Sequence, residues 1–415
     1  MELVFENTEE NYYTMRTFLS IFFLLVITNA SAQETDTLRV MSYNLLKFPN
    51  VSPNRIDTLK SILAYAKPDI FMVCELTSGA GADDILFDAL NEDGISSYDM
   101  GDYIPGPDTE NALYFNSEKL GLKEQNVIPT VLRDINEYVL YYKSEDLETA
   151  IDTVFFYVYV CHLKASTGFE DQRNAEADAL KSYISDRGIY ENIMIGGDFN
   201  LYGSGSEPAW NTILNGSGVE IKDPITAPGS WHTDPGFAWL HTQSTRTVGF
   251  DGGAFGGMDD RFDFIFIGDD LRTAENDAEY IDGSYRAIGQ DGLHYNKSLV
   301  EAPINTSEPA EIIWNLYHMS DHLPIYLEIK VDKRTSSIEK LVLENDLYYD
   351  AIGDQLVWKE QPLEPFDLVV FDLSGRQVMN KIQTSESLIQ TTSLVKGTYF
   401  VQINGQKQAV KFVKS

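Results

Sequence analysis

The chain of 415 residues is long enough for one large core and a smaller module, because single hydrophobic cores seldom grow past about 250 to 300 residues. Its 43% hydrophobic and 12% aromatic residues are typical of a globular protein rich in sheet. The formal net charge of −33 concentrates divalent cations but repels phosphate backbones, so tight, salt-driven binding to duplex nucleic acid is disfavoured.

Residues 1–32 have the pattern of an N-terminal extension followed by a secretory signal peptide. After Arg16 comes an apolar run, 18–27, and then the small residues Asn29-Ala-Ser-Ala32, after which cleavage is expected. The run spans about 15 Å as a helix, half of a bilayer's hydrocarbon core, so no stable membrane span is expected. The sequence therefore predicts an exported protein, either secreted or held at the cell surface.

Two predicted strands near the start of the mature chain end in oxygen-bearing side chains. The stretch 37–44 ends in Asn44, and the apolar run 69–75 ends in Glu75. Between them, an apolar stripe at helical spacing predicts a helix over 56–66. Amide and carboxylate oxygens suit Mg²⁺, Mn²⁺ or Ca²⁺, although a cap or turn role is the alternative for each residue.

Three more strands precede a second polar segment, and they are expected at 111–115, 138–142 and 153–160. The last leads into Cys161-His-Leu-Lys164, where His162 is either a functional histidine at a strand end or a buried core histidine. Lys164 and, more weakly, Arg133 and Arg246 are candidate phosphate contacts. Each of these cations could equally be an ordinary surface residue.

Two cysteines, Cys74 and Cys161, directly precede Glu75 and His162. They could pair in an exported protein, but buried free cysteines are common at strand positions, and we expect free thiols. The sequence has no Cys or His cluster with the ligand spacing of a zinc site.

A helix predicted over 171–186 leads to the stretch Ile193-Met-Ile-Gly-Gly-Asp-Phe-Asn200. Side chains two positions apart in a strand share a face, so Asp198 and Asn200 are expected to point into the same space. The preceding glycines, at 196 and 197, allow a sharp turn or the close approach of a ligand. A turn capped by its own side chains is the alternative.

The last polar strand ends follow a glycine-rich loop, 249–260, which is read as a lid, a Ca²⁺-binding loop or a surface insertion. Asp263 lies near the start of a predicted strand over 261–267. Asp321, a third oxygen donor for a cation, and His322 directly precede the strand predicted over 323–330. Such ends can converge on one rim of a two-sheet protein and supply the base, the acceptor that holds it and the donors that phosphoester hydrolysis needs.

The motifs resemble, in type and order, those of the endonuclease/exonuclease/phosphatase superfamily, which has the deoxyribonuclease I-like fold. The matching motifs, spread over about residues 37–330, are Ser42-Tyr-Asn44, Cys74-Glu75, His162-Leu163, Gly197-Asp-Phe-Asn200, Phe262-Asp263 and Ser320-Asp-His322. The resemblance implies an α/β fold, a four-layered sandwich of two packed β-sheets flanked by helices, with the site at one rim.

The resemblance also implies a role for each residue. Asn44 and Glu75 would hold the metal, and Asp198 with Asn200 would hold the phosphate and the attacking water. Asp263 would orient His322, the general base, with Asp321 beside it. His162 would donate to the phosphate or the leaving group; because Asp198 and His322 are alternative proton acceptors, they are assigned as a pair.

The composition changes after the predicted catalytic domain, 33–330. Residues 331–344 read as a linker, and short strands broken by turns follow over 345–415. Three motifs there resemble the C-terminal sorting domain of type IX secretion in Bacteroidetes-type bacteria, namely Val370-Phe-Asp-Leu-Ser-Gly-Arg376, Leu394-Val-Lys-Gly-Thr-Tyr399 and Lys411-Phe-Val-Lys414. The resemblance implies a small β-sandwich whose partner is the type IX secretion machinery.

Together these features predict an exported, divalent-metal-dependent phosphodiesterase, a nuclease acting on extracellular DNA or RNA. The resemblance disfavours abasic-site repair, because repair members tend to carry Tyr where this chain has His162. A phosphatase or sphingomyelinase acting on small or lipid phosphoesters is the alternative enzyme. A non-catalytic adhesin is disfavoured, because none of the expected site residues is missing, and the sequence leaves the oligomeric state open.

Overall fold

The computed structural model describes residues 34–50, 55–145, 147, 153–274, 277–333, 347–350, 353–358, 365–403 and 409–414. The predicted signal peptide, 1–32, and most of the predicted linker, 331–344, lie outside these residues. The described residues form two sets of sheets, one over 35–332 and one over 347–414, each with its own core. The predicted domain boundaries stay predictions.

Two mixed sheets make up the larger set. The strands of the first sheet are β1 (Thr35–Phe48), β2 (Ile70–Leu76), β3 (Tyr98–Met100), β4 (Glu110–Asn116), β11 (Ala278–Tyr280), β12 (Arg286–Ala287) and β13 (Ile325–Asp332). Those of the second are β5 (Leu120–Ile128), β6 (Ile135–Tyr142), β7 (Phe155–His162), β8 (Ile193–Asp198), β9 (Ile221–Lys222) and β10 (Asp263–Gly268). The orders are β11-β13-β1-β2-β4-β3, with β12 beside β13, and β5-β6-β7-β8-β10-β9.

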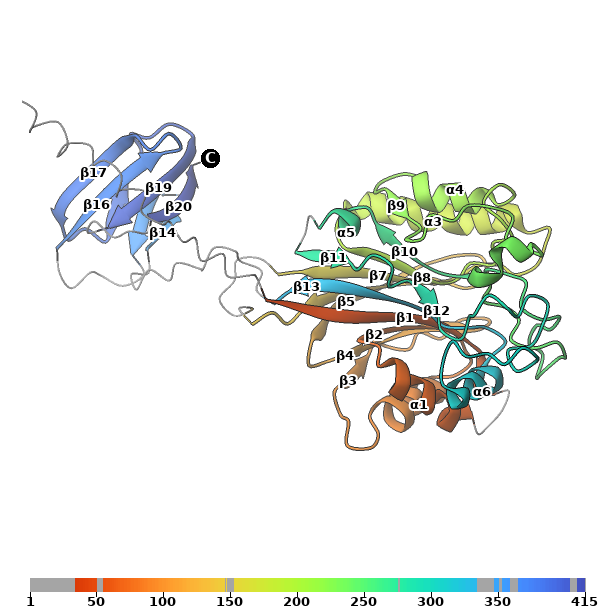
Figure 1. The fold of residues 1–415 in the computed structure, drawn as a ribbon. Coiled ribbons are helices and arrows are strands. Elements are labelled where there is room, and N and C mark those ends of the chain that lie inside the picture. The colour runs from red at the N-terminus through yellow and green to blue at the C-terminus, as the bar shows by residue number, and fades with distance from the viewer. Residues whose placement is uncertain are drawn as a thin grey trace, which may run out of the picture. The chain divides into compact units, whose positions relative to one another are not determined.

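The two sheets pack face to face, with helices on both outer faces (Figure 1). The first sheet is covered by α1 (Arg55–Ala66), α2 (Gly79–Asp84), η1 (Ile85–Leu90) and α6 (Ala310–Met319), and the second by α3 (Glu170–Arg187) and α4 (Pro208–Asn215). Because both faces of each sheet are covered, inner strands such as β2 and β8 are almost wholly buried. The predicted four-layered α/β sandwich is confirmed.

Strand register brings the polar ends together. The parallel pair β7 and β8 sets His162 opposite Asp198, and the antiparallel pair β8 and β10 sets Asp198 opposite Asp263. In the other sheet, the parallel pair β1 and β2 sets Asn44 opposite Cys74, the neighbour of Glu75. The residues that the sequence analysis singled out at these strand ends therefore meet at one edge of the sandwich.

The smaller set is a β-sandwich with one shared core. It consists of β14 (Leu347–Asp350), β15 (Gln355–Trp358) and β18 (Leu388–Gln390) in one sheet, and β17 (Gln377–Thr384), β16 (Phe366–Asp372), β19 (Gly397–Ile403) and β20 (Ala409–Lys414) in the other. Side chains from both sheets, including Leu356, Val370 and Val401, fill the space between them. Within the described residues, no helix is long and apolar enough to cross a bilayer.

Candidate active site

The site is centred on one carboxylate oxygen, Asp198 Oδ2, at the end of β8. Asn44 Nδ2 lies 3.1 Å from this oxygen, and the Nε2 atoms of His162 and His322 each lie 3.6 Å from it. These neighbours come from β1, β7 and the segment before β13, so both sheets contribute. Asp198 is buried, and its carboxylate is reached by three nitrogens at once.

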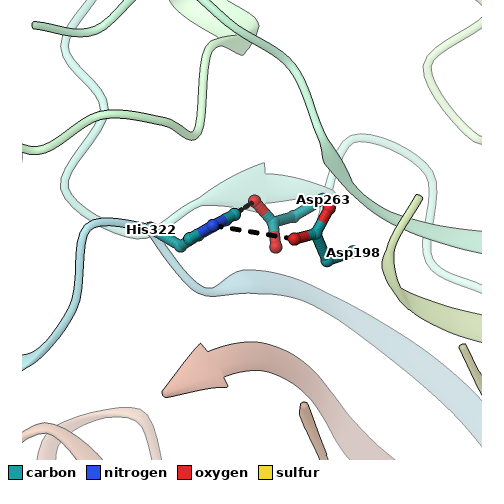
Figure 2. A group of neighbouring side chains, drawn as sticks. All are labelled: Asp198, Asp263 and His322. Carbon is teal, nitrogen blue, oxygen red and sulfur yellow. Dashed lines mark hydrogen bonds and ion pairs between the residues drawn. The ribbon is translucent and has the colours of Figure 1, made fainter. Parts of the chain in front are cut away.

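His322 is held by a carboxylate on its other side. Its Nδ1 lies 2.7 Å from Asp263 Oδ2, and Figure 2 shows the ring between Asp263 and Asp198. Asp263 thus fixes the orientation of the imidazole and stabilises its protonated form. Gln243 Nε2 lies 2.6 Å from His322 Nε2, where the amide can donate to a neutral ring. This glutamine lies in an irregular loop, and no sequence motif pointed to it.

Burial and charge shift the protonation of this pair. Burial alone would lower the pKa of His322, but the carboxylates of Asp263, Asp321 and Asp198 raise the pKa well above its usual value. Burial raises the pKa of Asp198 to about 7, against the lowering effect of His322. Both groups therefore favour their protonated forms in acid, and the pair loses protons only near or above neutral pH.

His162 differs from His322 in its electrostatic environment. Burial, with Arg133 and His322 nearby, lowers the pKa of His162 well below its usual value, so the ring is neutral at physiological pH. Within the described residues its Nδ1 is buried without a hydrogen-bond partner. A neutral imidazole with Nε2 directed at Asp198 can donate one hydrogen bond to a group that enters the site.

Glu75 and Asn44 border the side of the site that a cation could occupy. Glu75 Oε1 accepts from Asn44 Nδ2 at 3.1 Å, and its Oε2 accepts from the backbone N–H of Lys47 at 3.0 Å. Asn44 Oδ1 accepts from the Leu46 N–H, so the amide bridges the two carboxylates of Glu75 and Asp198 through its nitrogen. The Glu75 side chain is 16% exposed, whereas Asp198 is enclosed.

These residues fit a divalent ion. Ligand atoms of Asp198, Asp263 and His322 all lie within 4.8 Å of one another, which is compact enough for one ion. Asp263 already accepts a hydrogen bond from His322. The oxygens of Glu75 and Asp198 are therefore more available to bind a cation. Their hard oxygen donors suit Mg²⁺, Mn²⁺ or Ca²⁺.

Asn200 and Asp321 lie at the border of the cluster. The Asn200 backbone donates to Asp198 Oδ1 at 3.0 Å, and its side chain donates to the Leu163 carbonyl at 3.2 Å. Asp321 Oδ2 accepts from the Ala254 N–H at 2.6 Å and lies 3.5 Å from Gln243 Nε2. Asp321 therefore anchors the glycine-rich loop, and its role as a metal ligand stays a prediction.

The three predicted phosphate-contact cations are engaged elsewhere. Lys164 donates to the Ala165 carbonyl and lies over the Phe169 ring, and Arg133 pairs with Asp108 at 2.7 Å. Arg246 is buried, and its guanidinium lies against the rings of Phe250 and Tyr317 and donates to the Tyr317 carbonyl. Each contact gives the cation a structural role, and phosphate binding by these residues stays a prediction.

The two glycines before Asp198 serve packing between the sheets and strands. A Cβ at Gly197, where φ is +143°, would lie 1.8 Å from the Cys161 carbonyl oxygen on β7. A Cβ at Gly196 would lie 2.5 Å from Met72 Sδ of the opposite sheet. The expected close approach is therefore to the protein's own chain, and it brings β8 near enough to its neighbours to place Asp198.

Several residues around the site have a left-handed backbone that side chains rarely adopt. Their φ values are +49° for Leu46 and Lys47, +62° for Glu75 and +53° for Asn200. A non-glycine residue pays about 1–2 kcal/mol for this conformation. Such outliers commonly gather at functional sites, where neighbouring structure holds them in place.

Comparisons with known proteins concern both parts of the chain. Residues 355–415 match the model of a secretion system C-terminal sorting domain. This segment is a sorting domain. The predicted export of the protein, secreted or at the cell surface, is thereby confirmed.

The larger part of the chain is similar to solved structures of low sequence identity. D. rerio TDP2 with a single-strand DNA product is 16% identical, with 71% of this chain and 99% of that chain covered and a TM-score of 0.48. An endonuclease/exonuclease/phosphatase family protein from Bacteroides thetaiotaomicron is 17% identical, with 72% and 99% covered and a TM-score of 0.45. A mannosyl-6-phosphatase from the same organism is 16% identical, with 70% and 99% covered and a TM-score of 0.43. No curated protein has a matching sequence.

The sorting domain is closed by a polar network at one end of its sandwich. Asp354 accepts from the hydroxyls of Tyr349 and Thr391 at 2.8 Å each and from Lys414 Nζ at 2.6 Å. These contacts tie β14 and the segment after β18 to the final strand, β20. The network therefore stabilises one end of the sandwich.

Proposed function

We propose that the larger part of the chain is a divalent-metal-dependent phosphodiesterase, and that its substrate is nucleic acid outside the cell. The observation that carries this proposal is the convergence of Asn44, His162 and His322 on Asp198 Oδ2, with Asp263 behind His322. A base held by a carboxylate, a neutral donor and a site for a hard cation are the parts that phosphoester hydrolysis requires.

Glu75 and Asp198 would hold the metal, with the Asn44 amide beside them. When bound, a divalent ion neutralises charge on the phosphate oxygens and makes the phosphorus easier to attack. The Asn44 amide donates to both carboxylates, which offsets part of the cost of placing them side by side.

The histidines have separate tasks in this proposal. His322 accepts a proton from water at Nε2 while Asp263 stabilises the resulting imidazolium through Nδ1. Asp198 Oδ2 lies 3.6 Å from the same nitrogen, so its carboxylate can orient the attacking water beside His322. His162, neutral because its pKa is lowered, donates from Nε2 to a phosphate oxygen or to the leaving oxygen.

The nuclease assignment rests on the resemblance of the motifs and on export. His162, and not tyrosine, stands at the position that separates the secreted branches from abasic-site repair. The sorting domain, with the type IX secretion machinery as its partner, would deliver the enzyme to substrates outside the cell.

The test uses the purified exported protein with single-stranded DNA, RNA, sphingomyelin and a sugar phosphate, each with Mg²⁺ and with EDTA. We expect Mg²⁺-dependent cleavage of DNA or RNA, and a loss of at least about 100-fold in kcat for His322→Ala. The matched control is His318→Ala on α6, which should keep full activity. Cleavage of only the lipid or the sugar phosphate would overturn the nuclease assignment, and wild-type rates in His322→Ala would overturn the mechanism.

A further inference from the structure

A second histidine–aspartate pair lies beside the proposed centre. His232 Nδ1 lies 2.5 Å from Asp260 Oδ1, as His322 Nδ1 lies close to Asp263. The backbone N–H of His232 donates to the Tyr202 carbonyl at 3.1 Å. The His232 and Tyr202 rings pack in a T-shaped arrangement, with their centroids 5.1 Å apart. Three contacts thus fix the orientation of a histidine that no sequence motif singled out.

The two pairs straddle the same residue. Gln243 forms isolated β-bridges to Asp260 on one side and to His322 on the other. Since neighbouring strands are about 4.8 Å apart, the backbones of Asp260 and His322 are separated by about 10 Å. That span is on the order of the distance between neighbouring phosphates of one nucleic-acid strand. Tyr202, against which His232 packs, is only two residues beyond Asn200.

The second pair is built differently from a surface ion pair. The Asp260 side chain is only 12% exposed, and burial raises its pKa to about 6 against the lowering effect of His232. The His232 side chain is 44% exposed, and within the described residues its Nε2 has no hydrogen-bond partner. A buried carboxylate therefore holds a ring whose other nitrogen faces outward, and the imidazolium form of such a ring can donate to an anion.

We propose that His232, positioned by Asp260, binds a phosphate of the substrate strand next to the one that is cleaved. This inference rests on the proposed function and narrows it, because a second phosphate site serves a chain of phosphodiesters and is unused by a substrate with a single phosphate. His232 is thus a specificity-determining residue that favours polynucleotides.

The first experiment compares His232→Ala with His318→Ala, a partly buried histidine on α6 outside the site, in the full exported protein. The substrates are a short single-stranded DNA and bis(4-nitrophenyl) phosphate, which has one phosphate. We expect KM for the DNA to rise about tenfold in His232→Ala with kcat unchanged, and kcat/KM for the small diester to stay the same. His232→Lys, which places a positive charge at this position, should recover much of the affinity.

Equal losses on both substrates, or an unchanged KM for the DNA, would overturn the inference. Binding is measured separately by fluorescence anisotropy with the same DNA in the inactive His322→Ala background, where adding His232→Ala should weaken Kd by a similar factor. A Kd that His232→Ala leaves unchanged in this background would overturn the inference, whatever the effect of His232→Ala on KM. Failure of the wild type to cleave either substrate would instead overturn the proposed function.

Discussion

At the scale of single residues, the site depends on how nitrogens are distributed around Asp198 Oδ2. His162 and His322 lie at the same distance from this oxygen, yet the pKa of one is lowered and that of the other is raised. The difference follows from their neighbours, because Arg133 lies near His162 whereas Asp263 contacts His322. Two chemically identical side chains are thereby prepared as a neutral donor and as a proton acceptor.

Asp263→Asn tests this account of His322. The variant removes a carboxylate that raises the pKa of His322, so that pKa should fall. A base is active above its pKa, and the acid limb of the kcat profile should therefore move to lower pH. We also expect kcat to fall by about 100-fold or more, because the ring loses its orienting partner.

The measurement is the pH dependence of kcat for DNA cleavage. Asp269→Asn, an exposed acid just past the other end of β10, is the matched control and should leave the profile in place. An acid limb that stays at the wild-type pH in Asp263→Asn would contradict the assignment of that limb to His322.

At the scale of elements, the helices of the second sheet hold the segment that follows His162. Arg173 of α3 makes a bidentate ion pair with Glu207, at 2.7 and 2.9 Å, and both side chains are buried. The same guanidinium donates to the carbonyls of Lys164 and Ser166, each at 2.8 Å. One cation thus connects α3, the start of α4 and the chain just beyond β7.

Glu207→Ala should therefore destabilise the protein by about 3–5 kcal/mol, because it leaves the Arg173 charge buried without its partner. The matched control is Glu124→Ala, which removes the partner of Arg187 on the same helix; there the Glu124 side chain is 40% exposed, and the loss should stay below about 1 kcal/mol. Urea denaturation measures both losses. Similar losses in the free energy of unfolding for the two variants would show that burial does not make the ion pair of Arg173 and Glu207 more important for stability.

Regular elements could be predicted from sequence where one pattern dominated. The apolar stripes of 56–66 and 171–186 correspond to α1 and α3, and the apolar run before Asp198 is β8. By contrast, α6 was missed, although Ile312, Leu316 and Met319 form a buried stripe, because it follows a turn-rich segment and exposes Trp314. Periodicity reports burial on one face only when the other face is polar.

The site was predictable to the extent that its residues end regular strands. The register of neighbouring strands then places His162 and Asp263 on either side of Asp198. Gln243 and the pair of His232 and Asp260 lie in irregular segments, whose positions are fixed by tertiary contacts and by no local pattern. The need for glycine at position 197 could not be predicted for the same reason, because a side chain there would clash with a carbonyl oxygen on β7.

At the scale of the whole molecule, catalysis and export are assigned to different parts of the chain. The residues around Asp198 come from positions 44 to 322, and the sorting domain has a core of its own. Residues 1–32 carry −3, so the net charge of −33 leaves −30 on the rest of the chain, where it favours solubility outside the cell.

Deleting residues 334–415 should therefore abolish export without abolishing catalysis. We expect Mg²⁺-dependent nuclease activity to move from the medium and cell surface to the periplasm, at a specific activity within about twofold of the full-length enzyme. Activity assays on separated cell fractions measure this. Activity that still reaches the medium would contradict the role of the sorting domain, and inactive soluble protein would contradict the independence of the site.

The left-handed backbone at Leu46, Lys47, Glu75 and Asn200 affects how far this protein can be stabilised by mutation. A glycine would relieve this strain, but at buried Leu46 the lost apolar packing would outweigh the gain, so the stabilising change is expected at exposed Lys47. At Glu75 and Asn200, however, such a gain removes the side chain that the site uses. At Glu75 and Asn200, selection for stability and selection for turnover therefore act in opposite directions.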